Sequence, residues 1–118
     1  MDIKNLRKDY NKNKIDFNHI TDDPMHFFMN WLEEALEVNK EEANACVLST
    51  ISNESIPSSR VVLLKDVTKQ GFVFFTNYNS SKAKEINANN NVALNFYWPQ
   101  LERQVRITGV AKQILAES

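Results

Sequence analysis

Apolar residues first recur with helical spacing along this chain and then with the runs and alternation of strands. Asp23 can cap a helix and Pro24 suits a first helical position. Beyond them, apolar residues recur three and four positions apart, which is the spacing of one helix face. The stripe consists of Phe27, Phe28, Trp31, Leu32, Ala35 and Leu36. The pattern predicts a helix over about residues 24–39 whose apolar stripe packs on a core.

After the charged segment that follows this helix, the period changes to that of strands. The predicted strands cover residues 45–52, 58–67, 72–77, 92–98 and 102–115. A serine-capped short helix is predicted over 80–90, between the third and fourth strands. Pro99 ends the fourth strand, and Gly109 predicts a bulge or bend in the fifth.

This order of elements predicts a small antiparallel barrel or sandwich, mainly β with flanking helices (α+β). Connections this short favour antiparallel pairing, and many short strands with turn signals are typical of such folds. The 118 residues are enough for one domain with its own core. Residues 1–20, rich in Lys and Asn, are predicted to be an arm, and residues 21–118 the folded domain.

Composition excludes several classes of protein. Apolar residues make up 42% of the chain, charged residues 25%, and the net charge is −1, as in an ordinary globular protein. This balance disfavours a general nucleic-acid binder, which is usually basic. No apolar run reaches transmembrane length, and the polar first residues do not form a signal peptide. We therefore expect a cytoplasmic protein without a membrane or nucleic-acid partner.

The cysteine and the two histidines predict no metal site. Cys46, the one cysteine, cannot form an internal disulfide, and its apolar neighbours favour a buried thiol in a reducing compartment over a reactive one. His19 and His26 lack partners at metal-ligand spacing and are predicted to lie on the surface.

The start of the short helix is a candidate anion site. Ser80 and Ser81 open the helix, and Lys82 lies in its first turn. Free N–H groups and the helix dipole favour an anion there, and hydroxyls with an ammonium suit a phosphate. The alternative is a serine-capped helix with a solvated lysine.

Two strands carry further polar candidates. Arg60 and Lys65 bracket four apolar residues of the second strand, and residues five apart point to opposite faces. Without a bulge they would not bind one atom together, although they could contact different parts of one ligand. They are otherwise strand-end cations that reach water. In the fifth strand, Gln104, Arg106 and Thr108 share a face that is either solvent-exposed or lines a polar site.

Taken in order, these segments resemble the pyridoxamine 5′-phosphate oxidase family over nearly the whole chain. The central motifs are "RVVLLK" (60–65), "GFVFFTNYNSSKAKE" (71–85) and "NFYWPQLERQVRITG" (95–109). The N-terminal "LRKDY" (6–10) and "DPMHFFMNWLEEALE" (23–37) also resemble that family's leader and first helix. The ordered set is far more specific than any one motif.

The resemblance implies an FMN-binding split β-barrel that works as a homodimer, with FMN at the dimer interface. It implies oxidation of pyridoxine or pyridoxamine 5′-phosphate to pyridoxal 5′-phosphate. In that reaction a hydride passes to the flavin, and O2 reoxidises the flavin to give hydrogen peroxide. The flavin supplies the redox chemistry, so no acidic dyad, metal cluster or nucleophile is expected in the protein.

The resemblance also assigns roles to particular residues. The implied FMN contacts are Arg60, Val61, Val62, Leu63, Leu64, Lys65, Phe75, Thr76, Ser81, Lys82 and Gln104. Within this set, Lys82 is expected to bind the FMN phosphate and Gln104 the flavin ring. The implied substrate contacts are Arg7, Tyr10 and Lys65.

Two departures from the family pattern weaken these expectations. Ser81 stands where the family commonly has Arg, which removes a bidentate phosphate ligand and predicts weaker FMN binding. Family members also continue well beyond residue 118, with further cofactor and substrate contacts. An alternative function is therefore a non-catalytic split-barrel module that binds FMN or another phosphate-bearing cofactor. A small barrel that binds single-stranded nucleic acid is a third, disfavoured by the balanced charge.

Overall fold

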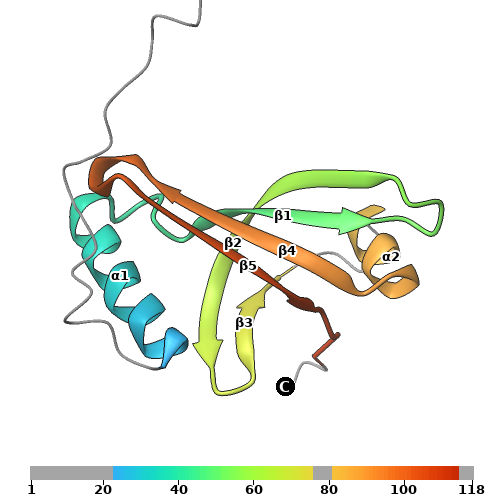
Figure 1. The fold of residues 1–118 in the computed structure, drawn as a ribbon, viewed down its shortest axis with the longest axis horizontal. Coiled ribbons are helices and arrows are strands. Elements are labelled where there is room, and N and C mark those ends of the chain that lie inside the picture. The colour runs from blue at the N-terminus through green and yellow to red at the C-terminus, as the bar shows by residue number, and fades with distance from the viewer. Residues whose placement is uncertain (1–22, 76–80, 115–118) are drawn as a thin grey trace, which may run out of the picture.

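The computed structural model describes residues 23–75 and 81–114, with the backbone alone for residues 81–83. In chain order the elements are α1 (Pro24–Val38), β1 (Ala45–Ile51), β2 (Pro57–Thr68), β3 (Gly71–Phe74), α2 (Ser81–Ala88), β4 (Asn91–Trp98), the 3-10 turn η2 (Pro99–Leu101) and β5 (Arg103–Val110). Figure 1 shows this arrangement. The predicted order of helix, three strands, short helix and two strands is confirmed.

The strands form one five-stranded sheet in the order β3-β2-β1-β4-β5. Each neighbouring pair is antiparallel, as the short connections predicted. β1 lies in the centre, so Leu48 is opposite both Arg60 of β2 and Leu94 of β4. The long connection through α2 lets β4 pair with β1 on the side away from β2.

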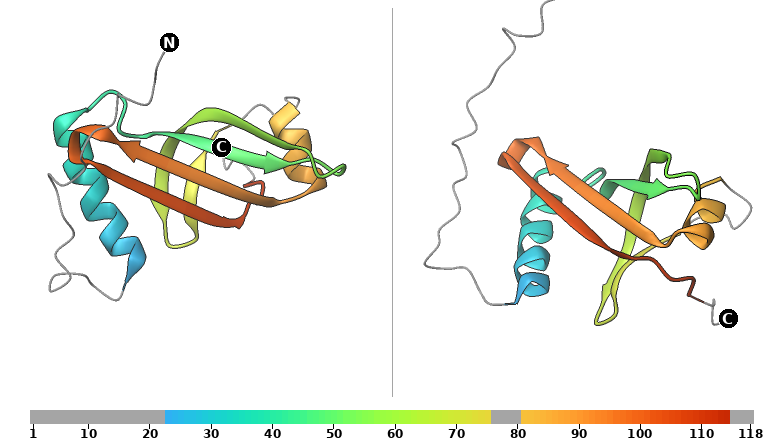
Figure 2. Two further views of the ribbon diagram at one scale, coloured as in Figure 1. Left: turned by 45° about the horizontal axis from the view of Figure 1, so that its top comes forward. Right: turned by 45° about the vertical axis from the view of Figure 1, so that its right-hand side comes forward.

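The sheet curls, and the two helices lie at opposite ends of it (Figures 1 and 2). The stripe of α1 packs on the inner face, where Phe28 makes an edge contact with Phe72 at 5.0 Å and lies 5.2 Å from Phe96 between ring centroids. The buried core consists of Phe28, Leu32, Ala35, Ala43, Cys46, Leu48, Val62, Leu64, Leu94, Phe96 and Trp98. The predicted apolar stripe of the first helix is therefore core.

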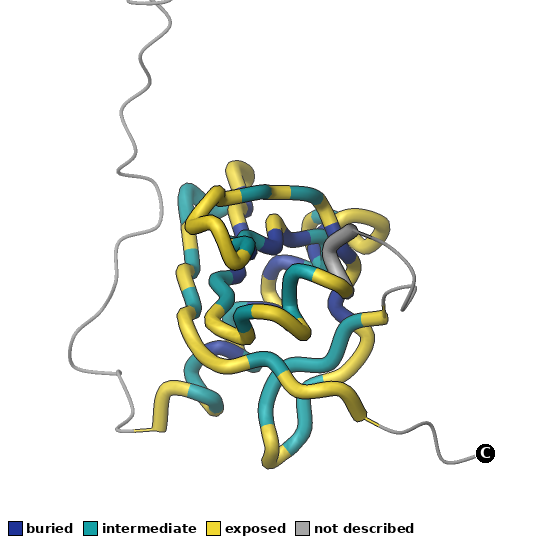
Figure 3. Tube along the Cα trace, turned by 90° about the vertical axis from the view of Figure 1, so that its right-hand side faces the viewer, coloured by how far each residue is buried: buried dark blue, intermediate teal, exposed yellow. Residues whose placement is uncertain are grey.

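Buried and exposed residues alternate along the strands (Figure 3), which separates this core from an exposed outer face of the sheet. Cys46, Leu48 and Thr50 of β1 are buried, whereas Val47 and Ile51 are exposed. The same alternation leaves Val61 and Leu63 of β2 and Tyr97 of β4 on the surface, together with the polar side chains of β5. One face of the curled sheet is thus covered by α1 and the core, and the other carries exposed apolar side chains.

Polar contacts fix α1 at its start and along its length. Asp23 accepts hydrogen bonds from the backbone N–H groups of Met25 and His26, so the predicted cap is confirmed. From the middle of the helix onward, Arg103 of β5 lies over the Trp31 ring at 4.5 Å and pairs with Glu34. These contacts join α1 to β5, an edge strand in the order above.

Three details differ from the sequence expectations. The predicted bulge at Gly109 is wrong, because β4 and β5 keep one register from Asn91–Val110 to Trp98–Arg103. The irregularity lies between Leu64 and Asp66, where the register of β2 against β3 shifts. β5 is also shorter than predicted, because its pairing with β4 ends at Val110. β3 pairs with β2 as far as Phe74, and residues 76–77 of the predicted third strand lie outside the described residues.

The burial predicted for two side chains agrees with the structure. Cys46 is buried and His26 is exposed. No group of three metal-binding side chains occurs among residues 23–75 and 81–114. In the same residues, no helix has the length and apolar character needed to cross a membrane. The predicted N-terminal arm and His19 lie outside the described residues.

Candidate functional site

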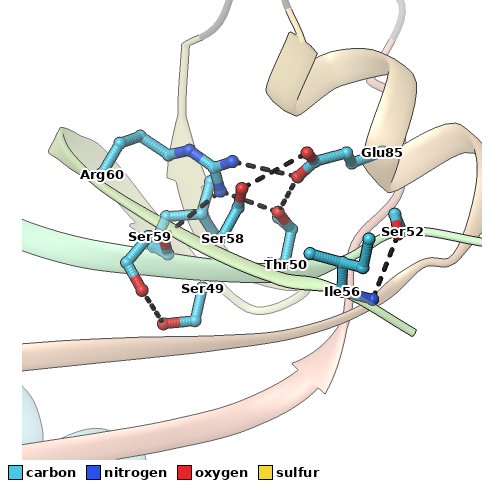
Figure 4. Close-up of polar contacts among 9 residues, drawn as sticks. Ser49, Thr50, Ser52, Ile56, Ser58, Ser59, Arg60 and Glu85 are labelled. Atoms are coloured by element: carbon cyan, nitrogen blue, oxygen red, sulfur yellow. Dashed lines mark hydrogen bonds and ion pairs between the residues drawn. The ribbon is translucent and has the colours of Figure 1, made fainter. Parts of the chain in front are cut away.

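Arg60 lies at the centre of a polar cluster between β1, β2 and α2 (Figure 4). Its Nη1 donates to Thr50 Oγ1 at 2.8 Å and to the Leu48 carbonyl at 3.3 Å. Its Nη2 donates to Glu85 Oε2 at 3.0 Å, which makes an ion pair across 25 residues of sequence. The cation at the start of the apolar strand is therefore paired and only partly exposed.

Strand alternation explains why the arginine points inward. Arg60 shares the inner face of β2 with Val62 and Leu64, both of which are core. Its neighbour on β1, Thr50, has no exposed surface, and burying a hydroxyl without a partner would cost free energy. Glu85 of α2 satisfies that hydroxyl, and it also accepts from Ser58 Oγ at 3.4 Å.

The cluster stabilises the charged form of Glu85. The pKa of Glu85 is lowered chiefly by the hydrogen bond from Thr50 and further by the hydrogen bond and positive charge of Arg60, although partial burial opposes them. Glu85 is therefore a carboxylate at neutral pH. Arg60 and Glu85 together form a compensated pair, as charges that leave water require.

The pair leaves part of the guanidinium available. A guanidinium has five N–H donors in a rigid fork. The contacts described for Arg60 use two donors on Nη1 and one on Nη2. Nε–H and the second Nη2–H have no partner among the described residues, and this edge matches two oxygens of a phosphate or carboxylate.

The main-chain groups of β2 point alternately to its two edges. Leu64 N–H bonds to the Asn44 carbonyl at 2.8 Å, so the alternate residues Val62 and Arg60 also turn their main-chain groups toward β1. Val61 and Leu63 turn theirs to the other edge. Within the described residues, the pairing of that edge with β3 begins at Leu64 and Phe74.

The side chains of residues 60–65 are divided between the buried and the exposed face of β2. Side chains of Val62 and Leu64 are buried in the core and cannot contact a ligand. Val61, Leu63 and Lys65 are on the exposed side of the strand. Lys65 falls at the register shift, yet it still faces away from Arg60. The predicted opposite orientation of the two cations is confirmed by this burial pattern.

Gln104 lies far from Arg60 in the sheet. It is exposed on β5, where it accepts a hydrogen bond from Asn95 Nδ2 at 3.1 Å. β1 and β4 separate its strand from β2, and it projects from the outer face, whereas Arg60 projects from the inner face. Next to it an open depression of about 480 Å³ is lined by Ser49, Ala93, Leu94, Asn95, Arg106, Ile107 and Thr108. The predicted Gln-Arg-Thr face is exposed in the single chain.

The structure describes only some of the remaining predicted site residues. Phe75 follows β3 and is 73% exposed. α2 begins at Ser81, as the sequence predicted within one residue, but the side chains of Ser81 and Lys82 are not described. Arg7, Tyr10, Thr76 and Ser80 lie outside the described residues.

Sequence reasoning missed three members of the cluster, namely Thr50, Ser58 and Glu85. The available signal was Thr50, a polar residue at an inward position of an otherwise apolar strand. A buried hydroxyl at that position requires a partner. The sequence does not say which residue supplies it, because Glu85 comes from a helix that follows two more strands.

Solved structures identify the class of fold. PhzG from Burkholderia lata, in complex with tetrahydrophenazine-1-carboxylic acid, matches 85% of this chain with a TM-score of 0.75 and 23% identity, over 51% of its own length. A pyridoxamine 5′-phosphate oxidase-related, FMN binding protein from Nostoc punctiforme matches 77% of this chain, and 47% of its own, with a TM-score of 0.67 and 18% identity. The fold is the antiparallel split barrel, as predicted.

Sequence relatives identify the family. A sequence model described as pyridoxamine 5′-phosphate oxidase matches residues 32–118. The pyridoxine/pyridoxamine 5′-phosphate oxidase of Actinobacillus succinogenes is 48% identical over 92% of this chain and 52% of its own length. That of Leptospira interrogans is 42% identical over 98% of this chain and 54% of its own length. The chain belongs to the pyridoxamine 5′-phosphate oxidase family, and it spans about half the length of these curated relatives.

Proposed function

We propose that this chain binds FMN and that Arg60 is a ligand of the cofactor phosphate. The observation that carries this proposal is the Arg60 guanidinium, which Thr50, Leu48 and Glu85 hold on one side while two N–H donors remain on the other. A fixed fork with a free edge is suited to a phosphate. Membership of the family supports FMN as the phosphate-bearing group.

The start of α2 is close enough to contribute to the same anion site. Glu85, which contacts Arg60, follows the first residue of α2 by four positions. With a rise of about 1.5 Å per residue, the helix N-terminus is about 6 Å farther along the axis. Its free N–H groups, with Ser81 and Lys82 in the first turn, would add to the positive field around a phosphate.

The flavin ring would be held by other groups of the chain. The main-chain groups of Val61 and Leu63 point to the edge of β2 away from β1, where they could meet a planar heterocycle, and Phe75 and Thr76 come next after β3 in the sequence. When bound, FMN supplies hydride acceptance and reoxidation by O2. The protein's part is to bind the phosphate and orient the ring.

A second copy of the chain would complete the site. Gln104 and Arg60 project from opposite faces of one sheet, so a single chain does not bring both to one ring. The outer face around Gln104 carries exposed Val47, Val61 and Tyr97, which a partner would cover. We therefore propose a homodimer with FMN at the interface, in which Gln104 of one copy serves the cofactor of the other.

The reaction we propose is oxidation of pyridoxine or pyridoxamine 5′-phosphate to pyridoxal 5′-phosphate with O2, in the cytoplasm. The curated relatives at 42–48% identity carry the corresponding names. Lys65 is exposed at the register shift of β2 and can face a bound substrate. The family resemblance supports Arg7 and Tyr10 as further substrate contacts. FMN loading followed by an assay for pyridoxal 5′-phosphate in air tests the reaction. Absence of product from a loaded protein contradicts it.

A second candidate is an FMN-binding module without turnover. The Arg60 cluster supports it, because holding a phosphate requires no reacting group of the protein. Both candidates predict FMN binding, which a titration of flavin fluorescence measures. Only the oxidase predicts pyridoxal 5′-phosphate and hydrogen peroxide from the loaded protein, so the same sample separates them.

A further inference from the structure

We propose that Glu85 is a positioning residue for the cofactor phosphate, because it fixes the Arg60 guanidinium with its Nε–Nη2 edge directed away from the cluster. This inference rests on the proposed binding of FMN. It adds a residue that contacts Arg60 and not the cofactor.

Glu85 connects three elements through one carboxylate. Oε2 accepts from Thr50 of β1 and from Arg60 of β2, and Oε1 accepts from Ser58 of β2 at 3.4 Å. Figure 4 shows the carboxylate facing these three groups from α2. A helix of eight residues is not stable on its own, so tertiary contacts set its position. The carboxylate therefore ties α2 to the strands that carry Arg60.

The same contacts limit the freedom of Arg60. An arginine side chain has several rotatable bonds, and ordering them opposes the binding of an anion. Glu85 occupies Nη2 while Thr50 and Leu48 occupy Nη1, so the guanidinium plane is fixed from two directions. A preorganised fork loses less freedom when a phosphate binds to its remaining edge.

Two substitutions test the role without altering Arg60. Glu85→Gln keeps the size of the side chain but loses the charge that pairs with Arg60. Thr50→Val is nearly isosteric and removes the hydroxyl that joins Arg60 to Glu85. Glu37→Gln, at an exposed position of α1, is the matched control for loss of one negative charge. Unfolding midpoints identify any variant that is globally destabilised.

The readout is the dissociation constant for FMN compared with that for riboflavin, which lacks the phosphate. A hydrogen bond to a charged group predicts that Glu85→Gln weakens FMN binding about tenfold. Riboflavin binding should change less than about twofold, since its ring does not contact this cluster. Thr50→Val should give the same selective loss, and Glu37→Gln should give none. A merely structural role would weaken both flavins alike.

A double-variant cycle tests whether Glu85 acts through Arg60. In an Arg60→Lys background the fork is absent, so adding Glu85→Gln should cost much less FMN affinity than it does in the wild type. Unchanged or tighter FMN binding by Glu85→Gln, equal loss of both flavins, or full additivity would overturn the inference while leaving FMN binding intact. If the wild-type chain binds no FMN, the inference and the proposed function both fail.

Discussion

Arg60 and Lys65 project from opposite faces of β2. Arg60 turns inward to Glu85 and the buried Thr50, whereas Lys65 is exposed beside the register shift. Two cations so arranged cannot bind one oxygen of a ligand. They can contact different parts of one extended ligand.

Replacing Arg60 with Lys should weaken FMN binding more than riboflavin binding. Lysine keeps the charge but loses the planar fork, and it cannot maintain contacts to Leu48, Thr50 and Glu85 at once. We expect the FMN dissociation constant to rise by about ten- to a hundredfold. Flavin fluorescence titration measures it, with the charge-conserving Lys40→Arg at an exposed position as the control. Equal affinity of Arg60→Lys and wild type for FMN would exclude Arg60 as a phosphate ligand.

Phe28 should be a major determinant of stability. Its ring is buried against Phe72 and Phe96, which joins α1 to β3 and β4. Phe28→Ala should lower the free energy of unfolding by about 3–5 kcal/mol, from lost burial and the cavity left behind. Urea denaturation checks this value. Val38→Ala, at a half-exposed end of α1, should change it by less than about 1 kcal/mol, and a similar loss for both would refute the packing account.

Periodicity in the sequence was sufficient to predict most of the fold. The helical stripe around Phe28 and the alternation in β2 specify which side chains enter the core, so the faces of Arg60 and Lys65 followed from counting residues. The bulge was misplaced because glycine at position 109 is compatible with a regular edge strand. The register shift beside Lys65 depends on how β3 meets β2, and no residue type marks it.

The sequence predicted individual residues of the candidate site but not how they are arranged in space. Arg60, Lys65 and Gln104 were predicted as site residues from sequence motifs. Their positions relative to one another in the sheet depend on the strand order, which the motifs do not give. The partner of Arg60 could not be found by local pattern, because Glu85 is 25 residues away on another element. Buried polar groups require partners, yet the sequence gives no distance between them.

The contribution of Glu85 to stability should depend on pH. Its pKa is lowered from the ordinary value of 4.5, chiefly by the hydrogen bond from Thr50, so the folded state binds its proton less tightly than the unfolded chain. The stabilisation is thus present above pH 4.5 and is lost as the pH falls through the folded value. The difference in unfolding free energy between wild type and Glu85→Gln should be largest at neutral pH and shrink in acid. Urea denaturation at several pH values measures it, and a constant difference would contradict the assignment.

Cys46 should be unreactive in the folded protein. Burial raises the pKa of its thiol to about 11, so little thiolate is present at mildly alkaline pH, and the surrounding core excludes reagents. Ellman's reagent should modify it slowly in the native state and rapidly in denaturant, with glutathione as the reference thiol. Native-state reaction as fast as that of glutathione would show that Cys46 is accessible.

The most direct test of the central claim is gel filtration of the chain after incubation with FMN, with visible absorbance and light scattering recorded together. We predict that flavin absorbance elutes with the protein, at the mass of two chains, and that Arg60→Lys retains less of it. Protein that elutes without flavin, under conditions where its fold is intact, would contradict FMN binding by this chain.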